Sequence, residues 1–515
     1  MDKWIADLGN GFYKNPILYT DYSDPDAIRV GDDYYMTASS FCNTPGLPIL
    51  HSKDLVNWEI INYALENIPE SRYEEPVHGC GVWAPAIRYH NGLFYIFFPM
   101  PDEGIYVITA KDPRNKWSEP VQIFKGAGWI DPCPLWDDDG RCYMVSAYAK
   151  SRIGFKSILR LTELSPDCTK IIDMGRDIFD GNVNDQVTIE GPKLYKRNGY
   201  YYIFAPAGGV KTGWQVVLRS KNIWGPYEYR NVMVQGDTDI NGPHQGAWVD
   251  TVTGEDWFLH FQDVYAAGRI VHLQPMKWEN DWPVIGEPHG EYGTPVKEYK
   301  KPDVGAVYPV SYIPASDNFD EKELSLQWQW NANHKNDWYK MTGSGIQLFA
   351  KESKVGAVCD IPNLLLQKWA FPEFSAVTEF DLKGMDDGGT AGMIHLGEKF
   401  GSVLIEKNNG LFSLAAIEGQ QVFRGEIPTS SEKNTVIEEN IKTERVYFKN
   451  TVKPIGKDEN NVPLWNSELY YSLDGKEYTK AVSFTAKAGR WVGVKHGIYC
   501  TGSTGSVIVK YFKYN

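Results

Sequence analysis

Residues 188–207 read Thr188-Ile-Glu-Gly-Pro-Lys-Leu-Tyr-Lys-Arg-Asn-Gly-Tyr-Tyr-Tyr-Ile-Phe-Ala-Pro-Ala207. The pair Asn198-Gly199 separates a run of mixed polarity from an aromatic run. Such a pair is a strong signal for a two-residue hairpin turn, because both residues tolerate a positive φ. The stretch therefore predicts two antiparallel strands, with Glu190 at the head of the first strand.

The same layout occurs five times in the first 300 residues. Its leading residues are separated by 60, 47, 59 and 54 positions, and they are Asp24, Ala84, Asp131, Glu190 and His244. A period of roughly 40–60 residues, with several strands per unit, is typical of a β-propeller. We therefore predict an all-β protein in which residues 1–300 form a five-bladed β-propeller.

In a propeller the equivalent position of every blade faces the central channel. The repeat therefore predicts that Asp24, Asp131, Glu190 and His244 meet in one pocket. Carboxylates that share a poorly solvated pocket raise one another's pKa, so the cluster is a candidate acid–base site. A single Asp-Pro pair more often starts a turn, but three carboxylates at repeated positions favour the catalytic interpretation.

The pattern changes after Asp317-Asn-Phe-Asp320. Runs of period 2, such as Phe374-Ser-Ala-Val-Thr-Glu-Phe-Asp-Leu382, alternate with turn signals such as Asn409-Gly410. This pattern predicts a C-terminal antiparallel β-sandwich, of the jelly-roll or lectin-like kind, over residues 317–515. Residues 301–316 are expected to be a linker.

The composition restricts the class of partner. The chain of 515 residues has 52 basic and 66 acidic side chains and a formal charge of -14, which argues against nucleic acid. No run approaches the ~20 apolar residues of a membrane span. Seven scattered cysteines without a CxxC pair indicate reduced thiols. With no apolar signal region at the start, a cytoplasmic location is expected, although a secreted or periplasmic protein without its signal peptide would look the same.

Several motifs resemble those of glycoside hydrolase family 43, and they follow one another in the same order. They are Asn15-Pro-Ile-Leu18, Ser23-Asp-Pro-Asp-Ala-Ile-Arg-Val30, Trp83-Ala-Pro85, Ile130-Asp-Pro132, Ile189-Glu-Gly-Pro192 and Gly268-Arg-Ile-Val-His-Leu-Gln-Pro-Met-Lys-Trp278. The second part of the chain resembles the sandwich carried by the β-xylosidase branch. The resemblance implies a five-bladed propeller that hydrolyses xylose- and arabinose-containing polysaccharides with inversion.

Carried over by motif, the resemblance implies that Asp24 is the general base and Glu190 the general acid. Asp131 would be the third carboxylate, which positions the acid and modulates its pKa. Inverting hydrolysis needs such a pair of carboxyl groups, roughly 6.5–9.5 Å apart, so that a water fits beside the anomeric carbon.

The resemblance also implies substrate-binding residues. Trp83 and Phe41 would form walls of the sugar pocket, and Arg269 would donate hydrogen bonds to sugar hydroxyls. His244 would lie in the channel as a substrate-binding residue. The chemistry needs no cofactor, but some members hold a hydrated calcium ion in the channel, so a structural Ca²⁺ beside His244 is the metal expectation.

The resemblance favours an exo-glycosidase that removes terminal β-1,4-linked xylose from a small oligosaccharide, with α-L-arabinofuranosidase activity on arabinoxylan or arabinan side chains as the alternative. A non-catalytic carbohydrate-binding propeller would lack channel carboxylates, and all three are present. A WD-type interaction propeller would show Gly-His and Trp-Asp signatures, which are absent. Homo-oligomer formation stays open. The loop Ala488-Gly-Arg-Trp-Val492 is a candidate lid over the pocket.

Overall fold

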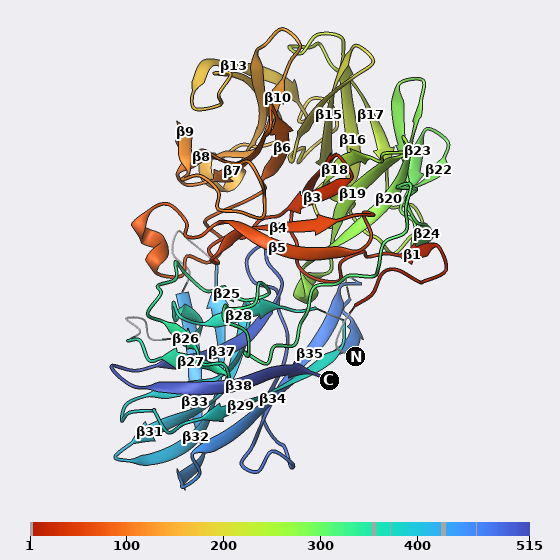
Figure 1. Ribbon diagram of the computed structural model, residues 1–515. Helices are drawn as coiled ribbons and strands as arrows, with labels where there is room; N and C mark the ends of the chain where they lie inside the picture. Colours follow the sequence, from red (N-terminus) through yellow and green to blue (C-terminus); the bar gives the residue numbers. More distant parts are fainter. Residues whose placement is uncertain (1–3, 353–356, 371, 424–428, 460) are drawn as a thin grey trace.

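The computed structural model of the protein describes residues 4–352, 357–370, 372–423, 429–459 and 461–515. It confirms the predicted class, because nearly all regular structure is β and is arranged in a propeller and a sandwich. The propeller carries the red to green part of the chain and the sandwich the cyan to blue part (Figure 1). Among the described residues, the only α-helix is the single turn α1 (Lys150–Ile153).

The five blades are four-stranded antiparallel sheets, each built from consecutive strands. Blade 1 comprises β2 (Asp26–Val30), β3 (Asp33–Thr37), β4 (Gly46–Ser52) and β5 (Trp58–Leu65). Blade 2 comprises β6 (Ala86–His90), β7 (Leu93–Met100), β8 (Gly104–Ala110) and β9 (Val121–Lys125). Blade 3 comprises β10 (Trp129–Trp136), β11 (Cys142–Tyr148), β12 (Ile158–Leu164) and β13 (Ile171–Asp180).

The last two blades complete the ring. Blade 4 comprises β14 (Lys193–Arg197), β15 (Tyr200–Ala207), β16 (Trp214–Ser220) and β17 (Glu228–Met233), extended by β23 (Tyr292–Thr294) and β22 (Glu287–His289). Blade 5 comprises β18 (His244–Asp250), β19 (Asp256–Asp263), β20 (Arg269–Glu279) and β21 (Trp282–Ile285). A separate pair is formed by β1 (Phe12–Lys14) and β24 (Glu298–Lys300).

The predicted hairpin turn between β14 and β15 is present. Asn198 and Gly199 have φ values of 49° and 74°, and Arg197 pairs directly with Tyr200. Positive φ at both central residues is the mark of a type I′ turn, whose twist matches that of the flanking strands. The Asn198-Gly199 pair therefore fixes the register of the first two strands of blade 4.

The ring is closed without a shared strand, by side-chain and backbone hydrogen bonds of the segment before blade 1. The side-chain nitrogen of Asn15 donates to the carbonyl oxygens of Leu273 and Val296, at 2.8 Å each. Its side-chain oxygen accepts the Leu273 N–H at 2.9 Å. Leu18 also forms a bridge to Val271. The segment before blade 1 is thereby fixed to blade 5.

The second part of the chain consists of two seven-stranded sheets. The first contains, in spatial order, β25 (Gln329–Trp330), β28 (Leu365–Lys368), β37 (Lys495–Thr501), β30 (Thr390–Leu396), β31 (Lys399–Asn408), β32 (Leu411–Val422) and β33 (Thr429–Ile441). The second contains β26 (Tyr339–Met341), β27 (Ile346–Phe349), β38 (Ser506–Tyr514), β29 (Phe374–Asp381), β34 (Arg445–Lys457), β35 (Pro463–Ser472) and β36 (Thr479–Thr485). Three short 3-10 turns accompany the strands, η1 (Ser71–Glu74), η2 (Tyr265–Ala267) and η3 (Val358–Asp360).

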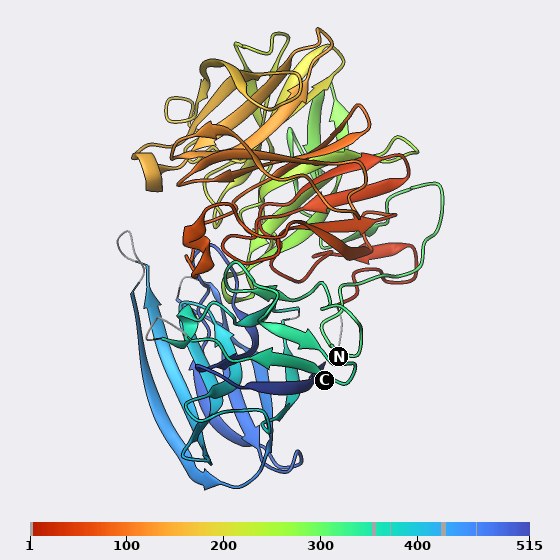
Figure 2. The same ribbon diagram turned by 60° about the vertical axis from the view of Figure 1, so that its left-hand side comes forward.

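The two domains share a hydrophobic core. Val264, Ala266 and Ala267, from the connection between β19 and β20, and Ile270 of β20 are buried in the same cluster as apolar residues of the sandwich. In Figure 2 the sandwich lies directly against one side of the propeller. Burial of apolar surface is the main favourable term in association. The connection within blade 5 therefore fixes the sandwich at the side of the propeller where the pocket described below opens.

Two further findings concern the whole chain. All seven cysteines are free thiols, and Cys80 alone among them is not fully buried. Within the described ranges, no helix combines the length and apolarity required to cross a bilayer.

Candidate active site

Four of the five leading residues, all except His244, line one pocket of ≈ 500 Å³ at the end of the propeller channel. The carboxylates of Asp24, Asp131 and Glu190 all contribute to its wall, together with Ala84 from blade 2. Convergence follows from the repeat, because each blade presents the start of its inner strand to the same axis. The structure thus brings together the three carboxylates that the sequence singled out.

The strand register corrects one detail of the repeat. Asp24, Asp131 and Gly191 each precede a proline, and each has a left-handed φ, of 57°, 56° and 59°. Gly191, rather than Glu190, is therefore the equivalent of the two aspartates. Aspartate and glycine are among the residue types that adopt this conformation most readily. Glu190 is one residue earlier and still lines the same pocket.

In blade 5 the pocket is lined by Gln245 and not by His244. The His244 imidazole is 1 % exposed, and its Nε2 lies 3.4 Å from Oε1 of Glu190. This contact places the ring behind the Glu190 carboxylate, where it restricts the orientation of that group. Gln245 has a φ of 38°, close to the left-handed values of Asp24 and Asp131. In the sequence, only the place of Gln245 directly after His244 indicated that it would face the pocket.

The groups around His244 bear on the Ca²⁺ ion that was expected beside it. Neither ring nitrogen of His244 makes a hydrogen bond to another described residue, but the buried ring does not line the pocket. Among the described residues, no group of three or more His, Cys, Asp or Glu side chains could hold an ion directly. Calcium at this position stays a prediction.

Asp24 is held by three donors. Its Oδ2 accepts hydrogen bonds from the hydroxyls of Ser23 and Ser39, at 2.6 Å each, and its Oδ1 accepts one from Nη1 of Arg269 at 3.2 Å. Burial lowers the pKa of Arg269, but the negative charge of Asp24 and then of Asp263 outweighs this effect and the net pKa is raised. The site therefore holds a cation beside the Asp24 side chain.

Asp131 is the most deeply buried of the three carboxyl groups, at 4 % exposure. Its pKa is raised to about 7: burial is the largest cause and the charge of Glu190 the next, while a hydrogen bond from the Gly191 N–H to Oδ2 at 2.7 Å acts in the opposite direction. A carboxyl group in a desolvated site beside a second carboxylate keeps its proton to higher pH. Asp131 therefore keeps its proton into the neutral pH range.

An aromatic wall faces the carboxylates. Phe41 and Trp83 have ring centroids 6.4 Å apart, and Trp491 packs edge-on against Trp83 at 6.2 Å. All three residues line the pocket. Trp491 belongs to the sandwich and is 43 % exposed, so the candidate lid loop reaches the pocket from the second domain. Aromatic faces of this kind stack on the apolar faces of sugar rings.

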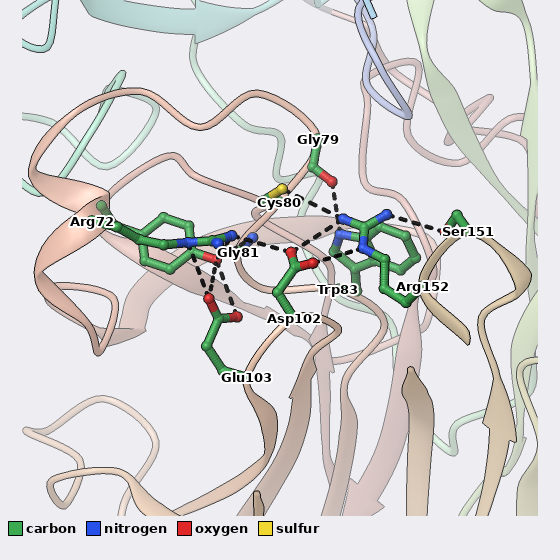
Figure 3. Close-up of polar contacts among 10 residues, drawn as sticks. Arg72, Gly79, Cys80, Gly81, Trp83, Asp102, Glu103, Ser151 and Arg152 are labelled. Carbon is green, nitrogen blue, oxygen red and sulfur yellow. Dashed lines mark hydrogen bonds and ion pairs between the residues drawn. The ribbon is translucent and has the colours of Figure 1, made fainter. Parts of the chain in front are cut away.

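A network of charged residues supports Trp83 from behind (Figure 3). The Arg152 guanidinium lies over the Trp83 ring at 5.0 Å, and the Trp83 indole N–H donates to the Gly79 carbonyl at 3.1 Å. Asp102 accepts two hydrogen bonds from Arg152, at 2.9 and 3.2 Å, and one from Arg72 at 3.1 Å. The planar fork of Arg152 thus joins Trp83 to the loop between β7 and β8.

The connections between the second and third strands of the blades also reach the pocket. They supply Phe41 in blade 1, Ala149 to Ser151 and Lys156 in blade 3, and Gly209 with Val210 in blade 4, and Tyr148 at the end of β11 also lines the pocket. In an antiparallel blade the start of the first strand and the end of the second lie at the same edge. Tyr148, Lys150, Ser151 and Lys156 were not predicted from the sequence, although this topological rule points to them.

The comparisons with known proteins agree with this site. Residues 13–283 match Glycosyl hydrolases family 43, and residues 316–515 match the Beta xylosidase C-terminal Concanavalin A-like domain. The fold and the carboxylate pocket are those of a propeller glycosidase, and the chain belongs to glycosyl hydrolases family 43.

Two relatives align along nearly the whole chain. A putative beta-xylosidase of Xylanibacter ruminicola is 38 % identical over 503 residues, covering 97 % of this chain and 88 % of that protein. A beta-xylosidase of Formosa agariphila is 31 % identical over 569 residues, covering 99 % and 91 %. A solved structure of a bifunctional GH43-CE protein of Bacteroides eggerthii superposes with a TM-score of 0.79 at 27 % identity, and this chain spans 64 % of its length.

The raised pKa of Asp131 predicts a pH-dependent stability. Between pH 4 and 7 the folded protein keeps a proton on Asp131 that the unfolded chain releases, so the stability that this group contributes is full below about pH 4 and is lost as pH rises through about 7. An Asp131→Asn variant has no such loss and should gain stability relative to the wild type across this window, by at most about 4 kcal/mol. Urea unfolding of both proteins from pH 4 to 8 measures the difference, and parallel pH curves would contradict it.

The network behind Trp83 predicts an effect on binding. Arg152→Lys keeps the charge but cannot make both bonds to Asp102 while it stacks on the indole, so KM for a xyloside or arabinofuranoside should rise roughly 5- to 30-fold with a smaller change in kcat. Arg197→Lys is the matched control, because Arg197 also stacks on a tryptophan, Trp278, and pairs with an aspartate, Asp281, outside the pocket. Equal KM values for Arg152→Lys and the wild type would show that the network does not position Trp83.

Proposed function

We propose that the protein is an inverting exo-β-xylosidase that releases terminal β-1,4-linked xylose from xylo-oligosaccharides. The observation that carries the proposal is the convergence of Asp24, Asp131 and Glu190 on a pocket whose aromatic wall includes Trp491 of the second domain. A wall from the sandwich beside the carboxylates favours the end of a sugar chain over its interior. The full-length relatives named beta-xylosidase support the choice of xylose.

In the proposed mechanism Asp24 is the general base. Its carboxylate, oriented by Ser23, Ser39 and Arg269, takes a proton from water as the oxygen attacks the anomeric carbon. Arg269 places its positive charge beside this base and also lines the pocket. Because the attack comes from the face opposite the leaving group, a β-xyloside gives α-xylose.

Glu190 is the general acid in this mechanism. Its side chain is 27 % exposed, lies against His244 and is neighbour to Asp131. Glu190 delivers a proton to the leaving oxygen as the glycosidic bond breaks. Asp131, whose Oδ2 accepts the Gly191 N–H, holds the chain at Glu190 in place.

The acid role is tested with leaving groups of different acidity. Glu190→Ala should lower kcat/KM on xylobiose by about 10²–10⁴-fold, and less on 2,4-dinitrophenyl β-xyloside, whose leaving group needs no proton. Glu228→Ala, which removes an exposed glutamate from the outer part of blade 4, is the control. A smaller loss on xylobiose than on the dinitrophenyl substrate would remove Glu190 from the acid role. Proton NMR of the first product should show α-xylose, and β-xylose would contradict inversion.

The same assay separates the two sugars. We expect kcat/KM on 4-nitrophenyl β-xyloside to exceed that on the α-L-arabinofuranoside. The opposite order would make the protein an arabinofuranosidase, and the roles of the carboxylates would be unaffected. No hydrolysis of either sugar, with binding intact, would indicate a carbohydrate-binding propeller.

The contribution of Trp491 is tested by product analysis. Trp491→Ala removes the part of the wall that comes from the sandwich, so KM for xylobiose should rise about tenfold, as expected for loss of a buried aromatic contact worth 1–2 kcal/mol. Cleavage inside longer xylo-oligosaccharides should also appear. Leu411→Ala is the control, since Leu411 has a similar exposure, 44 %, far along the sandwich. Unchanged products from xylohexaose would show that Trp491 does not limit the enzyme to chain ends.

A further inference from the structure

A single buried carboxylate connects the two domains beside the pocket. Asp21 precedes blade 1 and is 5 % exposed. Its Oδ1 accepts the backbone N–H of Arg269 at 2.8 Å, and its Oδ2 accepts the backbone N–H of Gly493 at 2.9 Å. Arg269 begins β20 of the propeller, and Gly493 lies in the sandwich, two residues after Trp491.

The backbones around Asp21 are in direct contact. A Cβ placed on Gly493 would lie 2.8 Å from Cα of Gly268, and a Cβ on Gly268 would lie 2.6 Å from the Asp21 side chain. The Val494 N–H donates to the carbonyl oxygen of Ala266 at 2.8 Å. No side chain separates the lid loop from the start of β20, so a shift of one requires a shift of the other.

From Arg269 the connection continues to the proposed base. The Arg269 side chain donates to Ser23 at 2.8 Å and to Asp24 at 3.2 Å, and Ser23 donates to Asp24 at 2.6 Å. Asp21 thus holds the main chain of the residue whose side chain orients Asp24.

The sandwich also surrounds Asp21 with positive charge. Lys368 lies over the ring of Tyr22 at 4.0 Å, and Lys495 donates to the side-chain oxygen of Asn43 at 2.8 Å. Burial lowers the pKa of Lys368 to about 8 and also lowers that of Lys495, while the charge of Asp21 acts in the opposite direction on both. Asp21 is therefore the anion that offsets two lysines of the second domain at the interface.

We infer that Asp21 is a positioning residue through which docking of the sandwich sets the geometry of Arg269 and Asp24. The second domain then acts on the catalytic step itself as well as on pocket shape. The inference rests on the proposed glycosidase function for its kinetic test only, since the contacts of Asp21 can be tested without substrate.

The kinetic test uses Asp21→Asn. An amide oxygen can accept only one of the two N–H groups, and its NH₂ opposes the other donor. We expect kcat/KM to fall on the order of 10- to 100-fold, as for small misplacements of reacting groups. The fall should be equal for good and poor leaving groups, because the base acts on both. The fall should appear in kcat with a smaller change in KM, because Asp21 does not line the pocket and acts through the positions of Arg269 and Asp24.

The matched control is Asp317→Asn. Asp317 is a buried carboxylate that also accepts two hydrogen bonds, from the Phe319 N–H at 2.7 Å and the Trp328 indole at 2.9 Å, within the sandwich. This variant should lose thermal stability without a fall in kcat. A similar loss of stability in Asp21→Asn with an unchanged kcat would show that Asp21 is only structural, and would overturn the inference.

Hydrogen–deuterium exchange provides the test without catalysis. In the wild type the amides of Arg269 and Gly493 should exchange with the same opening free energy, and in Asp21→Asn both should lose protection together. If Asp21→Asn does not fold, the wild-type measurement still decides. If the Gly493 amide exchanges while the Arg269 amide remains protected, the inferred coupling is wrong. If the two amides open together but the wild type hydrolyses no glycoside, only the proposed function is contradicted.

Discussion

The structure depends on the burial of several ionisable groups of both signs at one end of a propeller channel. Isolated buried charges are costly, and they are tolerated when partners and hydrogen bonds compensate them. Asp24 has Arg269 and two serines, and Asp131 has the Gly191 N–H and a raised pKa. The rest of the fold can be understood as the scaffold that keeps these partners in place, because removal of any one leaves an uncompensated group in a poorly solvated site.

That scaffold has two layers. The inner layer consists of the left-handed residues at the heads of the blades, which direct Asp24 and Asp131 into the pocket. The outer layer consists of longer-range contacts, such as the Arg152 and Asp102 pair behind Trp83 and the bonds of Asp21 to Arg269 and Gly493. The inner layer determines which chemistry is available, and the outer layer determines how rigidly the pocket walls are held.

The two layers differ in how far they can be predicted from sequence. The propeller, its hairpins and the three carboxylates follow from local signals, since Asn198-Gly199 and the recurring X-Pro pairs repeat at a regular interval. These local signals do not reveal an offset of one residue. Glu190 and His244 were therefore predicted at the blade positions that Gly191 and Gln245 occupy. The contacts of Asp21 join residues 248 and 472 positions apart, and no periodic pattern encodes such a pair. Likewise, the role of Arg152 follows from its contacts with Trp83 and Asp102, which the sequence does not reveal.

The shared core has a consequence for the history of the chain. Val264, Ala266, Ala267 and Ile270 are internal to the propeller sequence, yet they are buried among sandwich residues. A recombination event that exchanged the C-terminal module for an unrelated one would leave these four side chains facing water or a foreign surface. The two modules are therefore expected to be inherited together, and grafting this propeller onto another partner would require redesign inside blade 5 as well as at the boundary.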